Sequence, residues 1–168
     1  IHAAAESHVD RSFALNKNFI QTNVMGTRNV MEASKINKIK KIIHVSTDEV
    51  YGEIHKGKFN ENSTLNPSNP YSSSKAAAEM VINGYIHSYK LPVIIIRGNN
   101  IFGTRQHCEK LIPTCCTNII LGKKISIHGS GLQKRSFIYV DDFCEGINRI
   151  IEKGKSFNIY NIGTNFEY

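Results

Sequence analysis

The stretch Pro92-Val-Ile-Ile-Ile-Arg97 decides the fold, because it is almost continuously apolar and rich in β-branched residues. A strand that is covered on both faces needs this composition, whereas a strand with one wet face alternates apolar and polar residues. Lys41-Ile-Ile-His-Val-Ser-Thr47 has the same character. The two stretches therefore predict buried strands of one parallel sheet. Residue 1 also has the character of a buried strand, and shorter strand candidates lie at 125–128, 136–140 and 158–162.

Helical patterns separate these strands. Residues 16–36 predict one continuous helix, because apolar and small side chains recur at helical spacing on one stripe: Ile20, Val24, Thr27 and Met31. Asn69-Pro70 predicts the start of a helix that runs to about Tyr89, since Asn is a good N-cap and Pro suits the first helical position. Two further helices are expected at 109–121 and 141–153, each followed by Gly. This alternation predicts an α/β fold with a doubly wound, Rossmann-like parallel sheet.

Composition and charge narrow the function classes. The chain has 168 residues, of which 40% are hydrophobic and 21% charged, and its net charge is +7. Such a charge suits anionic ligands, but the basic residues are scattered without interleaved aromatic residues, so we expect no nucleic-acid partner. No apolar run is long enough to span a bilayer, so we expect no membrane partner. Four cysteines without C-x-x-C spacing predict reduced thiols in a cytoplasmic protein, and no metal site is expected.

Tyr71-Ser-Ser-Ser-Lys75 is the first candidate for chemistry. Residues four apart share one face of a helix, so the phenol and the ammonium are expected to be neighbours. A phenol ordinarily has a pKa near 10, and a nearby cation lowers that pKa toward the range of a useful base. A Tyr and a Lys that merely cover a helix surface are the alternative interpretation of this spacing.

Val45-Ser-Thr-Asp-Glu-Val-Tyr-Gly52 is the second candidate. Its polar side chains follow directly on a buried strand, and ligands of open α/β sheets bind beyond the carboxyl ends of the strands. Two adjacent carboxyls there can act as acid and base if their surroundings separate their pKa values. The alternative is a solvated loop that caps a helix. A third segment, residues 1–10, places small residues where a flat cofactor could approach the backbone.

Together these segments resemble the extended short-chain dehydrogenase/reductases, and among them the nucleotide-sugar 4,6-dehydratases of the dTDP-glucose 4,6-dehydratase type. The resemblance covers essentially the whole chain, and the tail looks most like the animal members. It rests on motifs in family order: Ala3-Ala-Ala-Glu-Ser-His-Val-Asp10, Thr22-Asn-Val-Met-Gly-Thr27, Ser46-Thr-Asp-Glu-Val-Tyr-Gly52, Asn69-Pro-Tyr-Ser-Ser-Ser-Lys75, Glu109-Lys-Leu-Ile-Pro113 and Asn161-Ile-Gly163. Related epimerases and sugar-acid decarboxylases share the Tyr-x-x-x-Lys pair but generally lack the Asp-Glu pair.

The resemblance implies an NAD-dependent reaction in which a sugar is oxidised at C4, loses water across C5 and C6, and regains the hydride at C6. In this assignment, Tyr71 takes the C4 hydroxyl proton and Lys75 lowers the pKa of Tyr71 and holds the nicotinamide ribose. Thr47 bonds the C4 oxygen, Glu49 takes the C5 proton, and Asp48 protonates the departing C6 hydroxyl. This division of labour requires an ionised Glu49 and a protonated Asp48.

The resemblance also implies binding residues. NAD contacts are expected from Ala3, Ala4, Ala5, Ser7, Thr22, Tyr71, Lys75 and the backbone near Ile101. Contacts to a nucleotide-diphosphate sugar are expected from Ser7, Thr47, Asn100, Lys110, Leu111, Ser126, His128 and Arg135. A guanidinium binds phosphate oxygens in a bidentate fork, which suits Arg135 to a diphosphate. The resemblance also implies that the full-length protein is a homodimer.

Two parts of the family pattern are absent from these 168 residues: the Gly-rich turn G-x-x-G-x-x-G and the remainder of the C-terminal substrate domain. We therefore expect residues 1–103 to be the later part of the NAD-binding domain, with the catalytic residues. Residues 104–168 would mix substrate-domain segments with a returning Rossmann strand. The chain by itself is expected to be inactive. A catalytically silent remnant, a partner-binding module and a related epimerase or decarboxylase remain as alternatives.

Overall fold

The computed structural model describes residues 1–54, 56–126 and 130–167. Its main sheet is parallel, with strand order β1-β2-β5, where β1 spans Ile42–Thr47, β2 Val93–Gly98 and β5 Ile159–Ile162. A second parallel pair is formed by β3 (Asn100–Phe102) and β4 (Phe137–Tyr139). The predicted α/β fold with a parallel, Rossmann-like sheet is confirmed.

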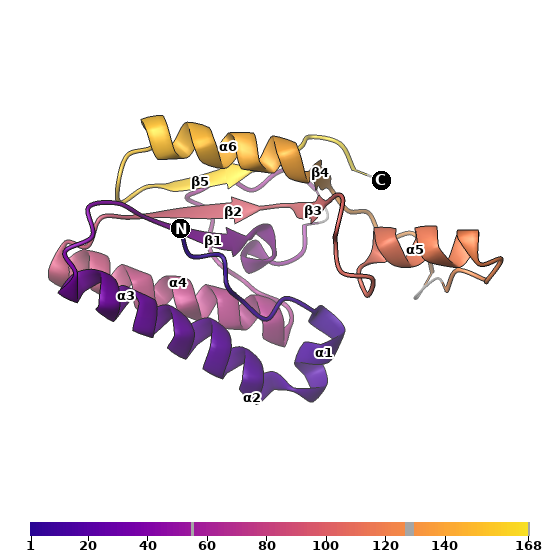
Figure 1. Cartoon of the computed structure of the whole chain (residues 1–168), viewed down its shortest axis with the longest axis horizontal. Coiled ribbons are helices and arrows are strands. Elements are labelled where there is room, and N and C mark those ends of the chain that lie inside the picture. The colour runs from indigo at the N-terminus through magenta and orange to yellow at the C-terminus, as the bar shows by residue number, and fades with distance from the viewer. Residues whose placement is uncertain (55, 127–129, 168) are drawn as a thin grey trace.

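Helices cover both faces of the main sheet. α3 (Gly26–Ile36) and α4 (Pro70–Tyr89) lie on one face, and α6 (Val140–Lys153) lies on the other (Figure 1). α1 (Val9–Ala14) and α2 (Asn16–Phe19) precede α3, and α5 (Leu111–Ile120) lies away from the sheet. The three strands of the main sheet point the same way in Figure 1, so their carboxyl ends share one edge.

The burial of β2 explains why its sequence predicts the fold. Every residue from Val93 to Gly98 is buried. Val93 and Ile95 join the cluster under α3 and α4, whereas Ile94 and Ile96 join the cluster under α6. Burying such a side chain contributes about 1.5–3 kcal/mol, so a strand between two layers gains on both faces.

The helix predicted for residues 16–36 differs from the structure in its middle. A π-helical segment, η1 (Ile20–Met25), separates α2 from α3. A π turn closes its hydrogen bonds over five residues, and it therefore changes which side chains face the sheet after it. Within η1, Asn23 is buried with an exposed fraction of 1%. The apolar stripe alone does not reveal this extra residue in the turn.

Two strand predictions need correction. Ile1 is 74% exposed, and the N-terminal segment forms only a single parallel bridge, between His2 and His44. Ile125 and Ser126 lie in no strand, and the rest of the candidate, including His128, falls outside the described residues. The other predicted strands and helices agree with the structure to within about two residues at their ends.

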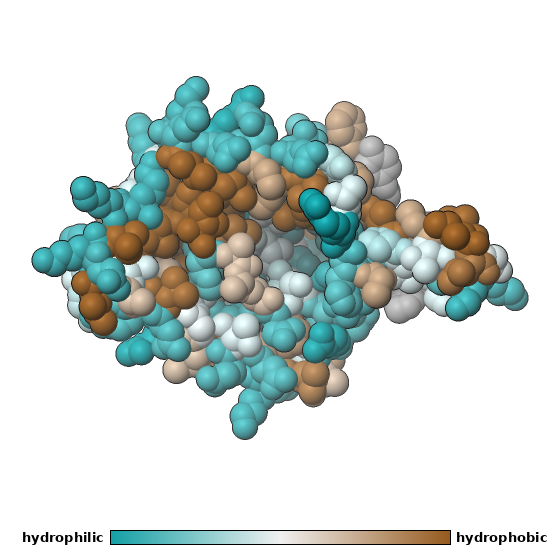
Figure 2. Space-filling view, viewed as in Figure 1, coloured by the Kyte–Doolittle hydropathy of each residue, from teal (hydrophilic) through white to brown (hydrophobic). Residues whose placement is uncertain are grey.

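Apolar side chains gather on the part of the molecule formed by α5 (Figure 2). Leu111, Ile119, Ile120 and Leu121 are each more than half exposed there. Among the helices of the described residues, none combines the length and the hydropathy that a bilayer crossing requires. The boundary between the two predicted domains at residue 103 stays a prediction.

Candidate active site

The candidate site lies where β1 ends at the shared carboxyl edge of the sheet. Thr47 is the last residue of β1, and the 3-10 turn η2 (Asp48–Tyr51) follows at once. The Thr47 hydroxyl accepts a hydrogen bond from the Glu49 amide, which caps this turn (3.3 Å). The two carboxyls of the Asp-Glu pair are therefore fixed directly beyond the sheet, as the sequence predicts.

Asn69 joins this turn to the helix that carries Tyr71. Its side-chain oxygen accepts from the Ser72 amide (2.8 Å) and completes a capping box at the start of α4. Its side-chain nitrogen donates to a carboxylate oxygen of Glu49 (3.0 Å). One amide therefore both begins the helix and holds Glu49. The capping role is predictable from the sequence, but the bond to Glu49 is not.

Asp48 is only partly exposed, and it accepts a hydrogen bond from the Thr47 hydroxyl (3.3 Å). Burial and the neighbouring Glu49 charge raise the pKa of Asp48 to about 6, although the Thr47 bond and backbone amides act in the opposite direction. Asp48 therefore keeps its proton to a higher pH than an ordinary Asp does. This is the direction that a proton donor requires.

The raised pKa of Asp48 predicts a pH-dependent cost in stability. A carboxyl whose pKa is higher in the folded state stabilises the fold at low pH, and this contribution is lost as pH rises through about 6. Asp48→Asn is therefore expected to raise the free energy of unfolding by about 1–3 kcal/mol at pH 8, with little effect near pH 4. Urea unfolding at both pH values measures this. Glu145→Gln, an exposed change on α6, is the control; an equal effect of Asp48→Asn at both pH values would contradict the prediction.

Tyr71 lies in the first turn of α4, and its ring meets the edge of the Phe19 ring at 6.3 Å. Burial and the Glu49 charge raise the pKa of Tyr71 above its ordinary value, whereas the Thr47 hydroxyl lowers it. In the protein alone, Tyr71 therefore holds its proton at neutral pH. A cation bound beside the phenol would shift this balance toward the phenolate.

Lys75 follows Tyr71 by one turn and is 4% exposed. Its ammonium group donates to the Val45 carbonyl oxygen of β1 (2.8 Å). Burial lowers the pKa of Lys75 to about 8, although the Glu79 carboxylate raises it. His44 lies in the same region, 1% exposed, and neither of its ring nitrogens has a partner among the described residues.

Asn23 holds the small-residue segment of the N-terminus in place. It accepts from the Glu6 amide (2.8 Å) and donates to the Glu6 carbonyl oxygen (3.0 Å), and it also donates to the Ser74 hydroxyl on α4 (2.8 Å). The segment of Ala3, Ala4, Ala5 and Ser7 is thereby tied to the helix that carries Lys75. Thr22, the neighbour of Asn23, is exposed. Reasoning from the sequence missed Asn23, although it lies within a quoted motif.

The structure brings some of the predicted substrate residues together. Lys110 donates from its ammonium group to the Ser7 carbonyl oxygen (2.7 Å), and Asn100 donates to the Ser136 carbonyl oxygen (3.1 Å). Leu111 is 59% exposed. Ser126 and Arg135 are exposed, and the Arg135 guanidinium donates to the carbonyl oxygen of the preceding residue. His128 lies outside the described residues.

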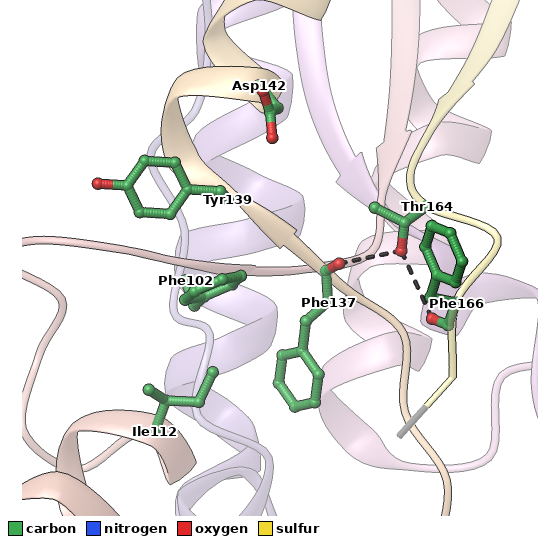
Figure 3. Close-up of a pocket in the computed structure, with 7 residues that line it drawn as sticks. All are labelled: Phe102, Ile112, Phe137, Tyr139, Asp142, Thr164 and Phe166. Carbon is green, nitrogen blue, oxygen red and sulfur yellow. Dashed lines mark hydrogen bonds between the residues drawn. The ribbon is translucent and has the colours of Figure 1, made fainter.

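A cavity lies beside β3, β4 and α5, and none of the predicted catalytic residues lines it. It measures about 450 Å³ and is lined by Phe102, Ile112, Phe137, Tyr139, Asp142, Thr164 and Phe166 (Figure 3). Thr164 donates to the Phe137 carbonyl oxygen at its rim (3.0 Å). A smaller cavity of about 240 Å³ lies next to it and includes Ile101. In the described part of the chain, no group of three acidic, His or Cys side chains could hold a metal ion.

The parallel α/β sheet and the Tyr–Lys pair one turn apart on a helix are the features expected of an extended short-chain dehydrogenase/reductase. The chain belongs to the NAD dependent epimerase/dehydratase family, whose model matches residues 1–163. NAD is the cofactor of this family, in agreement with the prediction.

Relatives and solved structures agree with this membership. The chain is 46% identical to dTDP-D-glucose 4,6-dehydratases of Dictyostelium discoideum and Homo sapiens, over 99% of its own length. It matches the crystal structure of DesIV, a dTDP-glucose 4,6-dehydratase from Streptomyces venezuelae with NAD bound, at a TM-score of 0.97 and 42% identity. That match covers 99% of this chain and 52% of DesIV.

An epimerase has the same fold. The UDP-glucuronic acid 4-epimerase of Bacillus cereus matches at a TM-score of 0.95 and 30% identity, over 100% of this chain and 54% of the epimerase. The chain spans 41% of the Dictyostelium relative and 48% of the human one.

Proposed function

We propose that this chain carries the catalytic centre of a nucleotide-sugar 4,6-dehydratase. The observation that carries the proposal is the Asn69 side chain, which caps the helix of Tyr71 and also bonds the Glu49 carboxylate. A half-buried Asp48 stands next to Glu49. Hydride transfer requires only the Tyr–Lys pair, whereas the loss of water also requires an acid and a base. The turn η2 supplies two carboxyls for these two roles.

The residues around Lys75 fit NAD. A lysine ammonium has three donors, and the described residues supply one acceptor, the Val45 carbonyl oxygen, so donors remain for a ribose hydroxyl. The exposed, small side chains of Ala3 and Ala4 leave the backbone of their segment open to a flat ligand. In this proposal NAD is held by Ala3, Ala4, Ala5, Ser7, Thr22, Tyr71, Lys75 and the backbone near Ile101. When bound, NAD supplies the hydride acceptor at C4 and the hydride donor at C6.

Tyr71 moves the first proton in this proposal. As a phenolate it accepts the proton of the C4 hydroxyl, and a cation beside it must first lower its pKa, which burial raises. Lys75 lies one turn further along the same helix face and is the protein's own cation for this purpose. The Thr47 hydroxyl, which donates to Asp48 in the protein alone, turns to hydrogen-bond the C4 oxygen when the sugar is bound and fixes its position.

The carboxyl pair then removes water. Glu49 takes the proton from C5, which a ketone at C4 acidifies, and its bond from Asn69 keeps the carboxylate oriented. Asp48, whose pKa burial raises to about 6, gives its proton to the departing C6 hydroxyl. The two adjacent carboxyls thus act in opposite directions.

The nucleotide-diphosphate sugar would meet residues from three segments. The contact of Lys110 with the Ser7 carbonyl oxygen supports their assignment to one binding surface. Within the described residues the Arg135 guanidinium has one hydrogen bond, to the neighbouring Lys134 carbonyl oxygen, and its exposed position suits it to a diphosphate. Asn100, Leu111, Ser126 and His128 complete the proposed set. We further propose that the protein acts in the cytoplasm as a homodimer.

A 4-epimerase is the second candidate, and the structural match to an epimerase favours it. The two reactions differ in the fate of the C5 hydrogen. A 4,6-dehydratase exchanges this hydrogen with solvent, whereas a 4-epimerase has no need to remove it.

The test uses the protein as its gene encodes it, with NAD, in deuterated water. Either dTDP-glucose or UDP-glucose is supplied, and the product is followed by NMR. The expected product is a 4-keto-6-deoxy sugar with deuterium at C5, from one of the two substrates. A galactose product with hydrogen at C5 would establish the epimerase, and no conversion of either substrate would contradict both proposals.

A further inference from the structure

Glu79 and Arg97 form an ion pair inside the protein, and no step proposed above uses it. Glu79 is 0% exposed on α4, and Arg97 is 3% exposed on β2. The guanidinium donates from Nη2 to Oε2 of Glu79 (2.6 Å) and from Nε to both carboxylate oxygens (3.2 Å each). Both carboxylate oxygens of Glu79 thus accept hydrogen bonds from the same guanidinium.

Glu79 shares a helix face with the proposed catalytic residues. Tyr71, Lys75 and Glu79 follow one another at intervals of four residues, which places them in consecutive turns of α4. The carboxylate therefore stands one turn beyond Lys75, on the side away from Tyr71. This single face of α4 carries a phenol, an ammonium and a carboxylate.

Arg97 extends this arrangement to the turn that carries the carboxyl pair. Its Nη1 donates to the hydroxyl of Tyr51 (2.8 Å), and the guanidinium lies over the Tyr51 ring at 4.7 Å. Tyr51 is the last residue of η2, the turn of Asp48 and Glu49. The Tyr51 hydroxyl in turn donates to the side-chain oxygen of Asn161 in β5 (2.8 Å).

An ion pair of this kind needs a reason other than stability. Removing two charges from water costs about as much as their attraction returns, so well-packed apolar residues often stabilise a fold as well or better. Breaking such a pair is costly, however, because one buried charge is left alone. The pair therefore fixes the separation of the elements that it joins more firmly than an apolar contact would.

We propose that Glu79, Arg97 and Tyr51 are positioning residues, which hold the Tyr71–Lys75 face of α4 against the turn of Asp48 and Glu49. The catalytic meaning of this role rests on the proposed function, but the mechanical coupling does not. In the described structure α4 is thus joined to η2 at two places: by the Asn69 amide at the start of the helix, and by the Glu79–Arg97–Tyr51 hydrogen bonds almost three turns further on.

The pKa of Lys75 is sensitive to the charge of Glu79, which lies at one end of the Glu79–Arg97–Tyr51 interactions. The titratable and charged groups that face it are His2 and His44, whose pKa values burial lowers first and the Lys75 charge lowers further, and Glu79. Burial lowers the pKa of Lys75, and Glu79 is the negative group that acts against this effect. Loss of the Glu79 charge must therefore lower the pKa of Lys75 below about 8.

The experiment compares three changes in the protein as its gene encodes it, without NAD or substrate. Tyr51→Phe removes the hydroxyl but keeps the ring that stacks on Phe59 at 5.1 Å. Glu79→Gln removes one charge, and the double variant E79Q/R97M removes both and leaves no unpaired buried ion. Glu145→Gln, which breaks the exposed pair with Arg149 on α6, is the matched control.

Two measurements test the interactions, one at the Glu79 end and one at the Tyr51 end. Titration of the Lys75 side chain by NMR is expected to move down by about one pH unit in E79Q/R97M, even where thermal stability is unchanged. Hydrogen exchange of the Gly52 amide, which closes η2 by donating to the Glu49 carbonyl oxygen, is expected to become about fivefold to tenfold faster in Tyr51→Phe. The control is expected to change neither.

If Glu79, Arg97 and Tyr51 only stabilised the fold, the two measurements would give a different result. If E79Q/R97M folds with an unchanged Lys75 titration, or if Tyr51→Phe leaves exchange in η2 unchanged, the coupling is refuted. If the Glu79 variants do not fold, exchange in Tyr51→Phe decides alone. Because no readout uses a sugar or NAD, a wrong reaction assignment would leave these results intact, and failure here would leave the reaction assignment intact.

Discussion

Glu49→Gln is expected to lower turnover by about 10²–10⁴-fold and to abolish the uptake of solvent deuterium at C5. A glutamine amide has the size of the glutamate and still accepts from the Asn69 side chain, so the start of α4 and the capping box are retained. What it lacks is the capacity to take a proton. The loss is therefore one of chemistry, and thermal stability is expected to stay near that of the parent protein.

Glu53→Gln provides the matched control for this change. Glu53 follows the same turn but is exposed, so its loss should leave both turnover and deuterium uptake unchanged. NMR of the product in deuterated water measures the two quantities together. Retention of C5 exchange in Glu49→Gln would remove Glu49 from the role of base and leave Asp48 as the alternative.

Gly52→Ala is expected to lower the free energy of unfolding by about 3–5 kcal/mol. Gly52 ends η2 with φ 85° and ψ −161°, a conformation that residues with a side chain almost never adopt. A Cβ at this position would also overlap the Asn66 carbonyl oxygen. The backbone has little room to move, since the Asn66 amide donates to the Val50 carbonyl oxygen (3.0 Å).

Gly57→Ala separates the two causes. Gly57 also has positive φ, 96°, but a Cβ there would meet no atom of the described residues within 4 Å. It should therefore show backbone strain of about 1 kcal/mol without the overlap. Urea unfolding of both variants gives the comparison. Equal losses at Gly52 and Gly57 would mean that the contact with Asn66 does not constrain the turn.

The parts of the fold that could be predicted are those marked by a pattern in a few consecutive residues. The unbroken β-branched run Val93–Ile96 identifies a strand between two layers, and Asn69-Pro70 identifies the start of α4 to the residue. Ile1 shows the limit of this approach: an apolar residue at the N-terminus suggests a strand, but burial depends on what lies beside it. The π segment was missed for a similar reason, because one extra residue in a turn leaves the average apolar periodicity almost unchanged.

The residues of the candidate site likewise fall into those that the sequence predicts and those that it does not. Thr47, Asp48, Glu49, Tyr71 and Lys75 stand out because their spacing is short, and the structure has them at one strand end and the adjoining helix start. The groups that hold them do not stand out. Asn23 and Ser74 are 51 positions apart, and Glu79 and Arg97 are 18 positions apart. Only the folded chain makes such pairs neighbours, so no spacing rule selects them in advance.

The π segment η1 constrains the number of residues between Phe19 and Met31. Phe19 before it meets the ring of Tyr71, and Met31 after it is buried in the core under α3 and α4. Deletion of one residue between Ile20 and Met25 would restore an α-helical turn and rotate these two side chains by about 100° relative to each other. Insertions and deletions, which surface helices often absorb, should therefore be rare in this stretch among functional relatives.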